Sequence, residues 1–246
     1  MSMLARLLQG LFRHAPKPRA RAPRAVDDGQ LAAMRFNACA DPAVCRGGCC
    51  RRGVRMLERD ALRIVAFIEA NPAHFALLRN VAAPLYRNQV AEGVRIYSTE
   101  TVTSDGPGRN GVNRAERAGD VVSDAERRTA HCVFLRPDSR CSLQVASEAL
   151  GHHKWAFKPV PCWLFPLRVV FAGEREGARC YRLEHAAGRG EMDDAACGRL
   201  EPGGAAASTA LAEEIARFHE WFPQDPERFV NEVQAGGATV RTDPVR

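Results

Sequence analysis

Four cysteines lie within the twelve residues CADPAVCRGGCC, with the spacing Cys39-x5-Cys45-x3-Cys49-Cys50. Thiolates are the form of cysteine that binds metals, and neighbouring thiolates repel one another unless a cation offsets their charge. Four such ligands suit a tetrahedral zinc ion or an iron–sulfur cluster. The stretch, which also contains a proline and two glycines and is expected to be a loop, therefore predicts a metal site.

The spacing leaves the metal and its ligand count open. It matches neither a zinc ribbon, which has two CxxC pairs, nor the CxxCxxC run of ferredoxins. The side chains of Cys49 and Cys50 diverge, so either one of them binds while the other packs, or the site holds more than one metal. Five more cysteines follow and could complete the ligand set: Cys132, Cys141, Cys162, Cys180 and Cys197.

The cysteine count also bears on the cellular compartment. The chain has nine cysteines, an odd number, and its first residues lack the apolar core of a secretory signal. No apolar run approaches the ~20 residues of a membrane span. We therefore expect a cytoplasmic protein, in which clustered cysteines favour metal or redox chemistry over a disulfide scaffold.

Charge is concentrated at the N-terminus. Residues 1–26 carry six basic side chains and no acid, so the rest of the chain is close to neutral although the net charge is +6. A neutral folded part gives no reason to expect nucleic-acid binding. Residues 1–14 have apolar positions at helical spacing. This pattern predicts a helix that contacts a membrane surface or a partner protein, an organelle transit peptide, or a poorly ordered tail.

Around these residues the sequence predicts an α+β fold, a small and mostly helical domain with short β-hairpins around a central cysteine-rich metal site. The predicted domain spans 29–236. It lies between an N-terminal basic helix and Pro/Arg linker (1–28), expected to be poorly ordered with no regular structure in the linker, and a flexible tail (237–246). Residues 57–70 have the apolar periodicity of an amphipathic helix that ends before a proline. Further helices are predicted over residues 73–80, 142–153, 191–200, 208–222 and 225–234, a helix or strand over 30–36, a strand over 94–103 and a surface loop over 104–119.

Three predicted segments carry the later cysteines. Residues 131–143 predict a tight hairpin that holds Cys132 and Cys141 near the ends of opposing strands. Residues 158–168 contain three prolines around a cysteine and predict rigid extended chain. A second hairpin, over 167–172 and 178–184, carries Cys180, for which a buried structural role is the simpler interpretation.

Three blocks in this order resemble the YkgJ-like cysteine-cluster family of zinc- or iron-chelating proteins. The blocks are FNACADPAVCRGGCC, CVFLRPDSRCSL and KPVPCWLFPLR, within residues 34–200. The chain departs from the family pattern in its longer first gaps, in the twenty residues between Cys141 and Cys162, and in Lys158-Pro159 where the family has Arg-Pro. These departures indicate a divergent branch with a helix inserted beside the site. The resemblance implies these ligands: Cys39, Cys45, Cys49, Cys50, Cys132, Cys141, Cys162 and Cys197.

Other residues have an ordinary interpretation beside a functional one. His131 could ligate or support a ligand, but a histidine at a hairpin edge is the simpler interpretation, and for His152 and His153 a favourable helix end suffices. The basic side chains of Arg136, Lys158 and Arg168 could offset thiolate charge or lie on the surface. Trp163 and Phe165 are expected to pack over the site and exclude water.

The function predicted from these features is metal binding, with zinc or an iron–sulfur cluster as cofactor. The alternative is a redox enzyme or enzyme accessory that uses an iron centre. No nucleophile elbow, phosphate-binding loop, HExxH motif or dinucleotide fingerprint occurs in the sequence, so no residue set supports the alternative.

Overall fold

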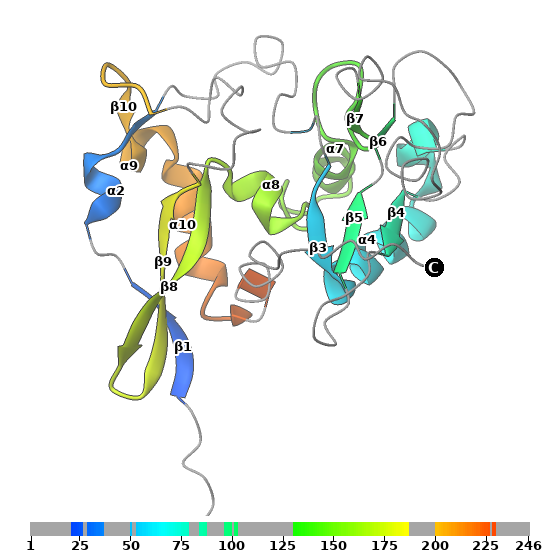
Figure 1. Ribbon diagram of the computed structural model, residues 1–246. Helices are drawn as coiled ribbons and strands as arrows, with labels where there is room; N and C mark the ends of the chain where they lie inside the picture. The colour runs from blue at the N-terminus through cyan, green and yellow to red at the C-terminus, as the bar shows by residue number, and fades with distance from the viewer. Residues whose placement is uncertain are drawn as a thin grey trace, which may run out of the picture.

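The structure is a computed structural model with a mixed α+β fold and several small sheets (Figure 1). None of the described helices is both long enough and apolar enough to cross a membrane. The structure describes residues 21–26, 29–36, 50, 53–78, 84–87, 96–99, 101–102, 130–186, 200–226 and 228–229.

Several sequence predictions fall outside these residues. They include the helix over 1–14, the loop over 104–119, the tail over 237–246 and all but the last residue of the helix over 191–200. The predicted ligands outside the described residues are Cys39, Cys45, Cys49 and Cys197.

Two groups of buried apolar side chains organise the described chain. We call the first the aromatic core, because all three tryptophans of the chain lie in it or pack against it. It contains Leu31, Phe36, Trp155, Val160, Trp163, Leu164, Leu167, Val169, Tyr181, Leu183, Ala207, Leu211, Phe218, Phe222 and Phe229. We call the second the cysteine-containing core; it consists of Met56, Ala61, Ile64, Phe67, Phe75, Leu85, Cys132, Val133, Phe134, Leu143 and Ala146.

The predicted second hairpin is confirmed and forms one face of the aromatic core. Strands β8 (Leu167–Arg175) and β9 (Ala178–His185) pair antiparallel, and their alternating residues are buried. Only two residues connect them, Glu176 and Gly177, and both have positive φ angles of 51° and 74°. Such a turn matches the twist of the paired strands, and glycine adopts this geometry without strain.

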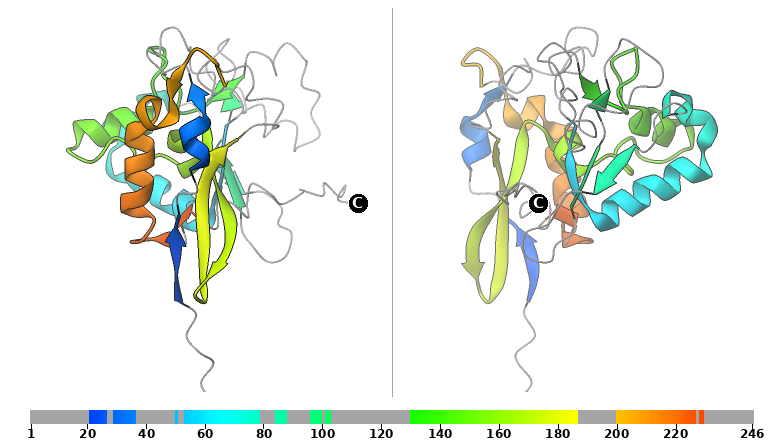
Figure 2. Two further views of the ribbon diagram at one scale, coloured as in Figure 1. Left: turned by 90° about the vertical axis from the view of Figure 1, so that its left-hand side faces the viewer. Right: turned by 45° about the vertical axis from the view of Figure 1, so that its right-hand side comes forward.

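The expectation of an irregular Pro/Arg linker is wrong for residues 21–25. They form β1 (Arg21–Ala25), which pairs parallel with β9, giving the strand order β1-β9-β8. Pro23 is tolerated because β1 is an edge strand and its register shifts between Arg21 and Arg24. β1 and the turn of the β8/β9 hairpin project together beyond the helices (Figures 1 and 2).

Short elements from both ends of the described chain close the aromatic core. The predicted helix over 208–222 is present as α9 (Ala207–Ala210) and α10 (Ala212–Trp221), separated at Leu211, whose φ of −124° is not helical. Helix α10 packs beside β8 and β9, and the rings of Tyr181 and Phe222 lie 5.6 Å apart. Upstream, the predicted 30–36 element is both a helix and a strand: α2 (Gln30–Ala33), then β2 (Arg35–Phe36), which pairs with β10 (Ala205–Ala206).

The predicted helix over 57–70 is confirmed as α4 (Glu58–Ala70) and supports the cysteine-containing core. It buries Ala61, Ile64 and Phe67, which recur at helical spacing. Its C-terminus is fixed by Asn71, whose side-chain amide donates to the Phe67 carbonyl at 2.9 Å. The following helix is the 3-10 helix η2 (Pro72–Leu78).

Small sheets and one further helix complete this core. Strand β5 (Ile96–Thr99) lies between β3 (Arg55–Leu57) and β4 (Leu85–Arg87), antiparallel to both. The predicted strand over 94–103 is therefore divided, because β6 (Thr101–Val102) belongs to a different sheet. Strand β6 pairs with β7 (His131–Cys132), and α7 (Ser142–Ala149) follows as predicted.

The segment with three prolines is not extended as predicted. Residues Val160–Leu164 form the short helix α8, with Pro159 at the N-cap and Pro161 in the first turn. Proline lacks an amide hydrogen, and the first amides of a helix have no intrahelical acceptor, so these positions accept it. The third proline, Pro166, follows the end of the helix and is preceded by a cis peptide bond.

Residues 155–160 join the two cores (Figure 1). Trp155 and Val160 belong to the aromatic core, whereas Phe157 packs against the cysteine-containing core. The Phe157 ring stacks on Phe67 of α4 with 3.8 Å between the ring centroids. We call residues 155–160 the junction segment.

Candidate metal centre

Three predicted ligands lie in or against the cysteine-containing core. Cys132 is 7% exposed and belongs to the core, while Cys50 and Cys141 are partly buried and pack against it. They come from separate parts of the chain: the end of the cysteine-rich stretch, β7, and the N-cap of α7. They share one apolar core, and the convergence of their thiols on a metal stays a prediction.

Cys162 lies differently. It is partly buried on α8, and its helix neighbours Val160, Trp163 and Leu164 all belong to the aromatic core. Among the residues that the structure describes, no three cysteine, histidine, aspartate or glutamate side chains are grouped closely enough to hold a metal ion. A tetrahedral centre of the predicted kind would thus need ligands from the residues outside the described ranges.

The connection from Cys132 to Cys141 is less regular than the predicted hairpin. Cys132 pairs with Thr101 of β6, whereas Cys141 forms an isolated antiparallel bridge with Leu135. A turn separates the two pairings, in which the Leu135 amide donates to the Cys132 carbonyl at 2.9 Å. The tight hairpin is nevertheless present over residues 134–142, because the Arg136 amide donates to the Arg140 carbonyl at 2.9 Å and the Ser142 amide to the Phe134 carbonyl at 2.7 Å. Cys132 precedes this paired part, so the predicted hairpin over 131–143 is confirmed in part.

Asp138 holds the loop between these cysteines. Its carboxylate accepts hydrogen bonds from the backbone amide of Arg140 at 3.2 Å and from the guanidinium of Arg140 at 3.0 Å. Arg136 adds a bond from Nε at 3.3 Å. Burial acts to raise the pKa of the Asp138 carboxyl, but these bonds outweigh it and keep the pKa below the ordinary value of 3.8. The loop is thus fixed by an ionised carboxylate at neutral pH.

The first residues of α7 leave one polar group unmatched. Cys141 occupies the N-cap position without a side-chain capping bond. The adjacent Ser142 is 2% exposed, and its hydroxyl has no hydrogen-bond partner among the described residues. A buried hydroxyl normally has a hydrogen-bond partner, so Ser142 is a polar position at the start of α7 that the described residues leave unmatched.

The basic side chains near the cysteines are engaged elsewhere. Arg136 binds Asp138, and Nε of Arg168 donates to Glu184 at 2.9 Å across the β8/β9 hairpin. These contacts favour the ordinary interpretation of both arginines. Lys158 donates to the Gln144 side chain of α7 at 3.2 Å, which ties the junction segment to the helix that follows Cys141.

His153 supports the aromatic core. Its Nδ1 accepts a hydrogen bond from the Trp155 amide at 3.2 Å, and its ring lies 5.1 Å from that of Trp221. Burial lowers the pKa of His153 below 6.5, and charged neighbours act in both directions: Arg217 and Lys154 lower it, Glu213 and Glu220 raise it. The imidazole is therefore neutral at pH 7.

Cys180 and Trp163 occupy ordinary core positions. Cys180 is 1% exposed on β9, and its thiol contacts the Ala178 carbonyl at 3.7 Å, which fits the structural role expected for it. Trp163 stacks on Trp155 with the ring centroids 5.0 Å apart. It shields the interior of the aromatic core.

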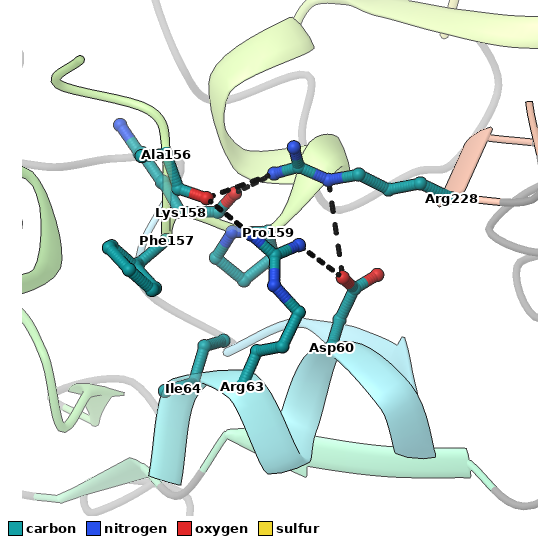
Figure 3. Close-up of a pocket in the computed structure, with 8 residues that line it drawn as sticks. All are labelled: Asp60, Arg63, Ile64, Ala156, Phe157, Lys158, Pro159 and Arg228. Atoms are coloured by element: carbon teal, nitrogen blue, oxygen red, sulfur yellow. Dashed lines mark hydrogen bonds and ion pairs between the residues drawn. The ribbon is translucent and has the colours of Figure 1, made fainter. Parts of the chain in front are cut away.

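A buried charge cluster was missed from the sequence (Figure 3). Asp60 of α4 is 5% exposed and lies 3.3 Å from Arg63 and 4.0 Å from Arg228. A recess of about 10 Å³ beside them has room for about one water molecule, too little for an organic ligand. The available signal was the position of Asp60, four residues before Ile64 on the apolar face of a predicted helix.

The chain was also compared with known proteins. No protein-family model, no curated protein and no solved structure matches it.

Proposed function

We propose that the protein binds a metal through cysteine thiolates, as a zinc ion or an iron–sulfur cluster. The supporting observation is the concentration of thiols. Four lie in residues 39–50, and the last of these, Cys50, lies at the same apolar core as Cys132 and Cys141. The finer fold prediction, a mostly helical domain whose hairpins surround the centre, belongs to this proposal. So does membership of a divergent branch of the YkgJ-like family, which rests on the three sequence blocks.

The proposed ligands divide into two groups by their support. Cys50, Cys132 and Cys141 are supported by the sequence and by their positions at the cysteine-containing core, whereas Cys162, on a helix of the aromatic core, is supported by the sequence. The remaining ligands are proposed from the sequence and the resemblance alone: Cys39, Cys45, Cys49 and Cys197. A bound zinc ion or cluster would neutralise thiolate charge and add folding free energy, as structural metal sites do.

Anaerobic purification followed by metal analysis and absorption spectroscopy tests the proposal. We expect either stoichiometric zinc in a colourless protein, or iron with labile sulfide and a broad band near ~400 nm. The zinc result would exclude the alternative of a redox enzyme with an iron centre. A folded protein that contains no bound metal under these conditions would refute metal binding itself.

Cysteine variants test the ligand assignment. Cys132→Ser and Cys141→Ser should lower the metal content per chain, because a hydroxyl is a poor ligand for a thiophilic metal. Cys180→Ser is the matched control, since Cys180 is as buried as Cys132 but lies in the hairpin of the aromatic core. Full metal content in the first two variants would refute their role as ligands.

A further inference from the structure

Arg228 inserts its guanidinium group into the junction between the two cores (Figure 3). The group donates to the backbone carbonyls of Trp155, Ala156 and Lys158 at 3.5, 3.5 and 3.3 Å. Its other side faces Asp60 of α4, with 4.0 Å between Nε and the carboxylate oxygen. Arg228 is 8% exposed, so these contacts are made away from bulk water.

The shape of this site suits a guanidinium group. All three carbonyls are contacted by Nη2, while Nε faces the carboxylate, so the planar group presents two different nitrogens to the two kinds of oxygen. An ammonium group has a single nitrogen and cannot hold both directions in one plane. Arg63 approaches the same oxygens from α4, with contacts to Asp60 and to the Ala156 carbonyl, both at 3.3 Å. Arg63 is 41% exposed and Arg228 only 10% at the side chain, so Arg228 is the buried occupant.

The carbonyls that Arg228 holds lead directly into the helix that carries Cys162. Pro159 follows Lys158 and caps α8, and its carbonyl accepts from the Cys162 amide at 2.9 Å. Pro159 and Pro161 restrict the backbone of this short connection. A displacement of the junction segment would therefore also move Cys162.

We infer that Asp60 and the carbonyls of Trp155, Ala156 and Lys158 form a guanidinium receptor, and that Arg228 fills it and thereby positions Cys162. Arg228 acts through the backbone and is a positioning residue. The inference rests on the proposed function for its consequence, that Cys162 is oriented as a metal ligand. Its structural part, control of Cys162 by Arg228, does not need the metal.

Chemical rescue of Arg228→Ala tests the receptor. In metal-free protein, we expect Cys162 to be alkylated faster by iodoacetamide than in the native chain, measured by mass spectrometry with buried Cys180 as internal reference. Millimolar ethylguanidinium should restore the native rate, because it fits the vacated receptor. Sodium chloride at equal ionic strength should have no such effect.

A metal titration tests the consequence. With Co²⁺ alone as the probe, Arg228→Ala should weaken binding about 10–100-fold, as the loss of groups that orient ligands does. Ethylguanidinium should recover affinity and the intensity of the thiolate–cobalt absorption. Arg59→Gln is the matched control. Arg59 of α4 pairs with Asp225 at 2.7 Å on the surface, so it also links α4 to the chain that carries Arg228, but through a carboxylate and not through the junction carbonyls.

The outcomes separate the two proposals. Unchanged Cys162 alkylation in folded Arg228→Ala, or a change that ethylguanidinium does not reverse, overturns the inference. A native chain that binds no Co²⁺ and contains no metal after anaerobic purification refutes the proposed function, while the alkylation result still decides the role of Arg228. Should Arg228→Ala fail to fold, Arg228→Lys keeps the charge near Asp60 but loses the fork, and native alkylation of Cys162 in that variant overturns the inference equally.

Discussion

Replacing Asp60 with asparagine should destabilise the protein strongly. The substitution keeps the size of the side chain and removes only its charge, leaving the guanidinium of Arg228 buried without its anion. Breaking a buried ion pair from one side typically costs about 3–5 kcal/mol, because the remaining charge is not solvated. An exposed pair contributes only about 0–1 kcal/mol.

The contacts of Asp60 narrow the expected change in the free energy of unfolding. The separation between Asp60 and Arg228 is 4.0 Å, at which two unit charges interact by about 4 kcal/mol at an effective dielectric constant of about 20. The second partner, Arg63, is 41% exposed and can be solvated after the substitution, so its pair adds little. Asparagine also still offers a carbonyl oxygen. We therefore expect a loss of about 3 kcal/mol in the free energy of unfolding, or about 6–12 °C in Tm for a chain of this size.

Urea unfolding followed by tryptophan fluorescence measures this change, because all three tryptophans report on the adjoining aromatic core. Glu176→Gln is the matched control, since it makes the same carboxylate-to-amide change in a pair with Arg24 that is 69% exposed at the glutamate. It should change the free energy by less than about 0.5 kcal/mol. Equal effects of the two substitutions would refute the reasoning that burial makes the Asp60 cluster costly to break.

Three further predictions follow from single positions. Burial lowers the pKa of His153 below 6.5, so on acidification the unfolded chain binds a proton before the folded chain does. The free energy of unfolding should therefore decline below about pH 6.5. In urea melts over a pH series, His153→Gln should reduce this decline. Phe218→Ala should cost about 3–5 kcal/mol, because Phe218 is 0% exposed, whereas Phe171→Ala, at a 53% exposed position, should cost much less in the same melts. Gly53→Ala should lower Tm measurably, since Gly53 has a φ of +69° and an added Cβ would lie 2.6 Å from the Thr99 hydroxyl.

Sequence periodicity identified the elements whose own residues determine them. Helix α4 was predicted because its apolar residues recur at helical spacing and a proline follows it. The β8/β9 hairpin was predicted because two short runs that contain apolar residues, LRVVFA and ARCYRLE, flank a glycine-containing turn. In both cases the local pattern and the tertiary contacts favour the same structure.

Proline-rich segments were predicted less well, because composition does not specify the tertiary environment. Residues 21–25 looked unable to form regular structure, yet the exposed edge of β9 accepts them as a strand. The segment with three prolines looked extended, yet Pro159 and Pro161 occupy the helix positions where proline costs least. The proline content of residues 158–168 did not indicate that part of this segment forms the helix α8.

Some features of the candidate site were likewise predicted from the sequence, and others were not. The type and spacing of the cysteines predicted that distant segments approach one another at a metal, and this stays a prediction. Among the described cysteines, Cys132 belongs to one apolar core, and Cys50 and Cys141 pack against it. The pairing of Asp60 with Arg228 was invisible, because nothing near either residue in the sequence indicates the other. Long-range pairs between charged side chains have no periodic signature, whereas an acidic residue on an apolar helix face does indicate that some partner must exist.

The junction segment connects the buried charge cluster with the proposed metal centre, so both should affect the stability of the protein. Trp155 packs into the aromatic core and Phe157 into the cysteine-containing core, so the segment is the place where the cores are joined. Arg228 holds its backbone from the side of the aromatic core, and α4 holds it from the other side through Arg63, which donates to the Ala156 carbonyl. A metal bound by Cys132 or Cys141 together with Cys162 would be a second link between the same two cores. Each link lowers the entropy lost in forming the other, so the buried charge cluster and the proposed metal centre should stabilise each other.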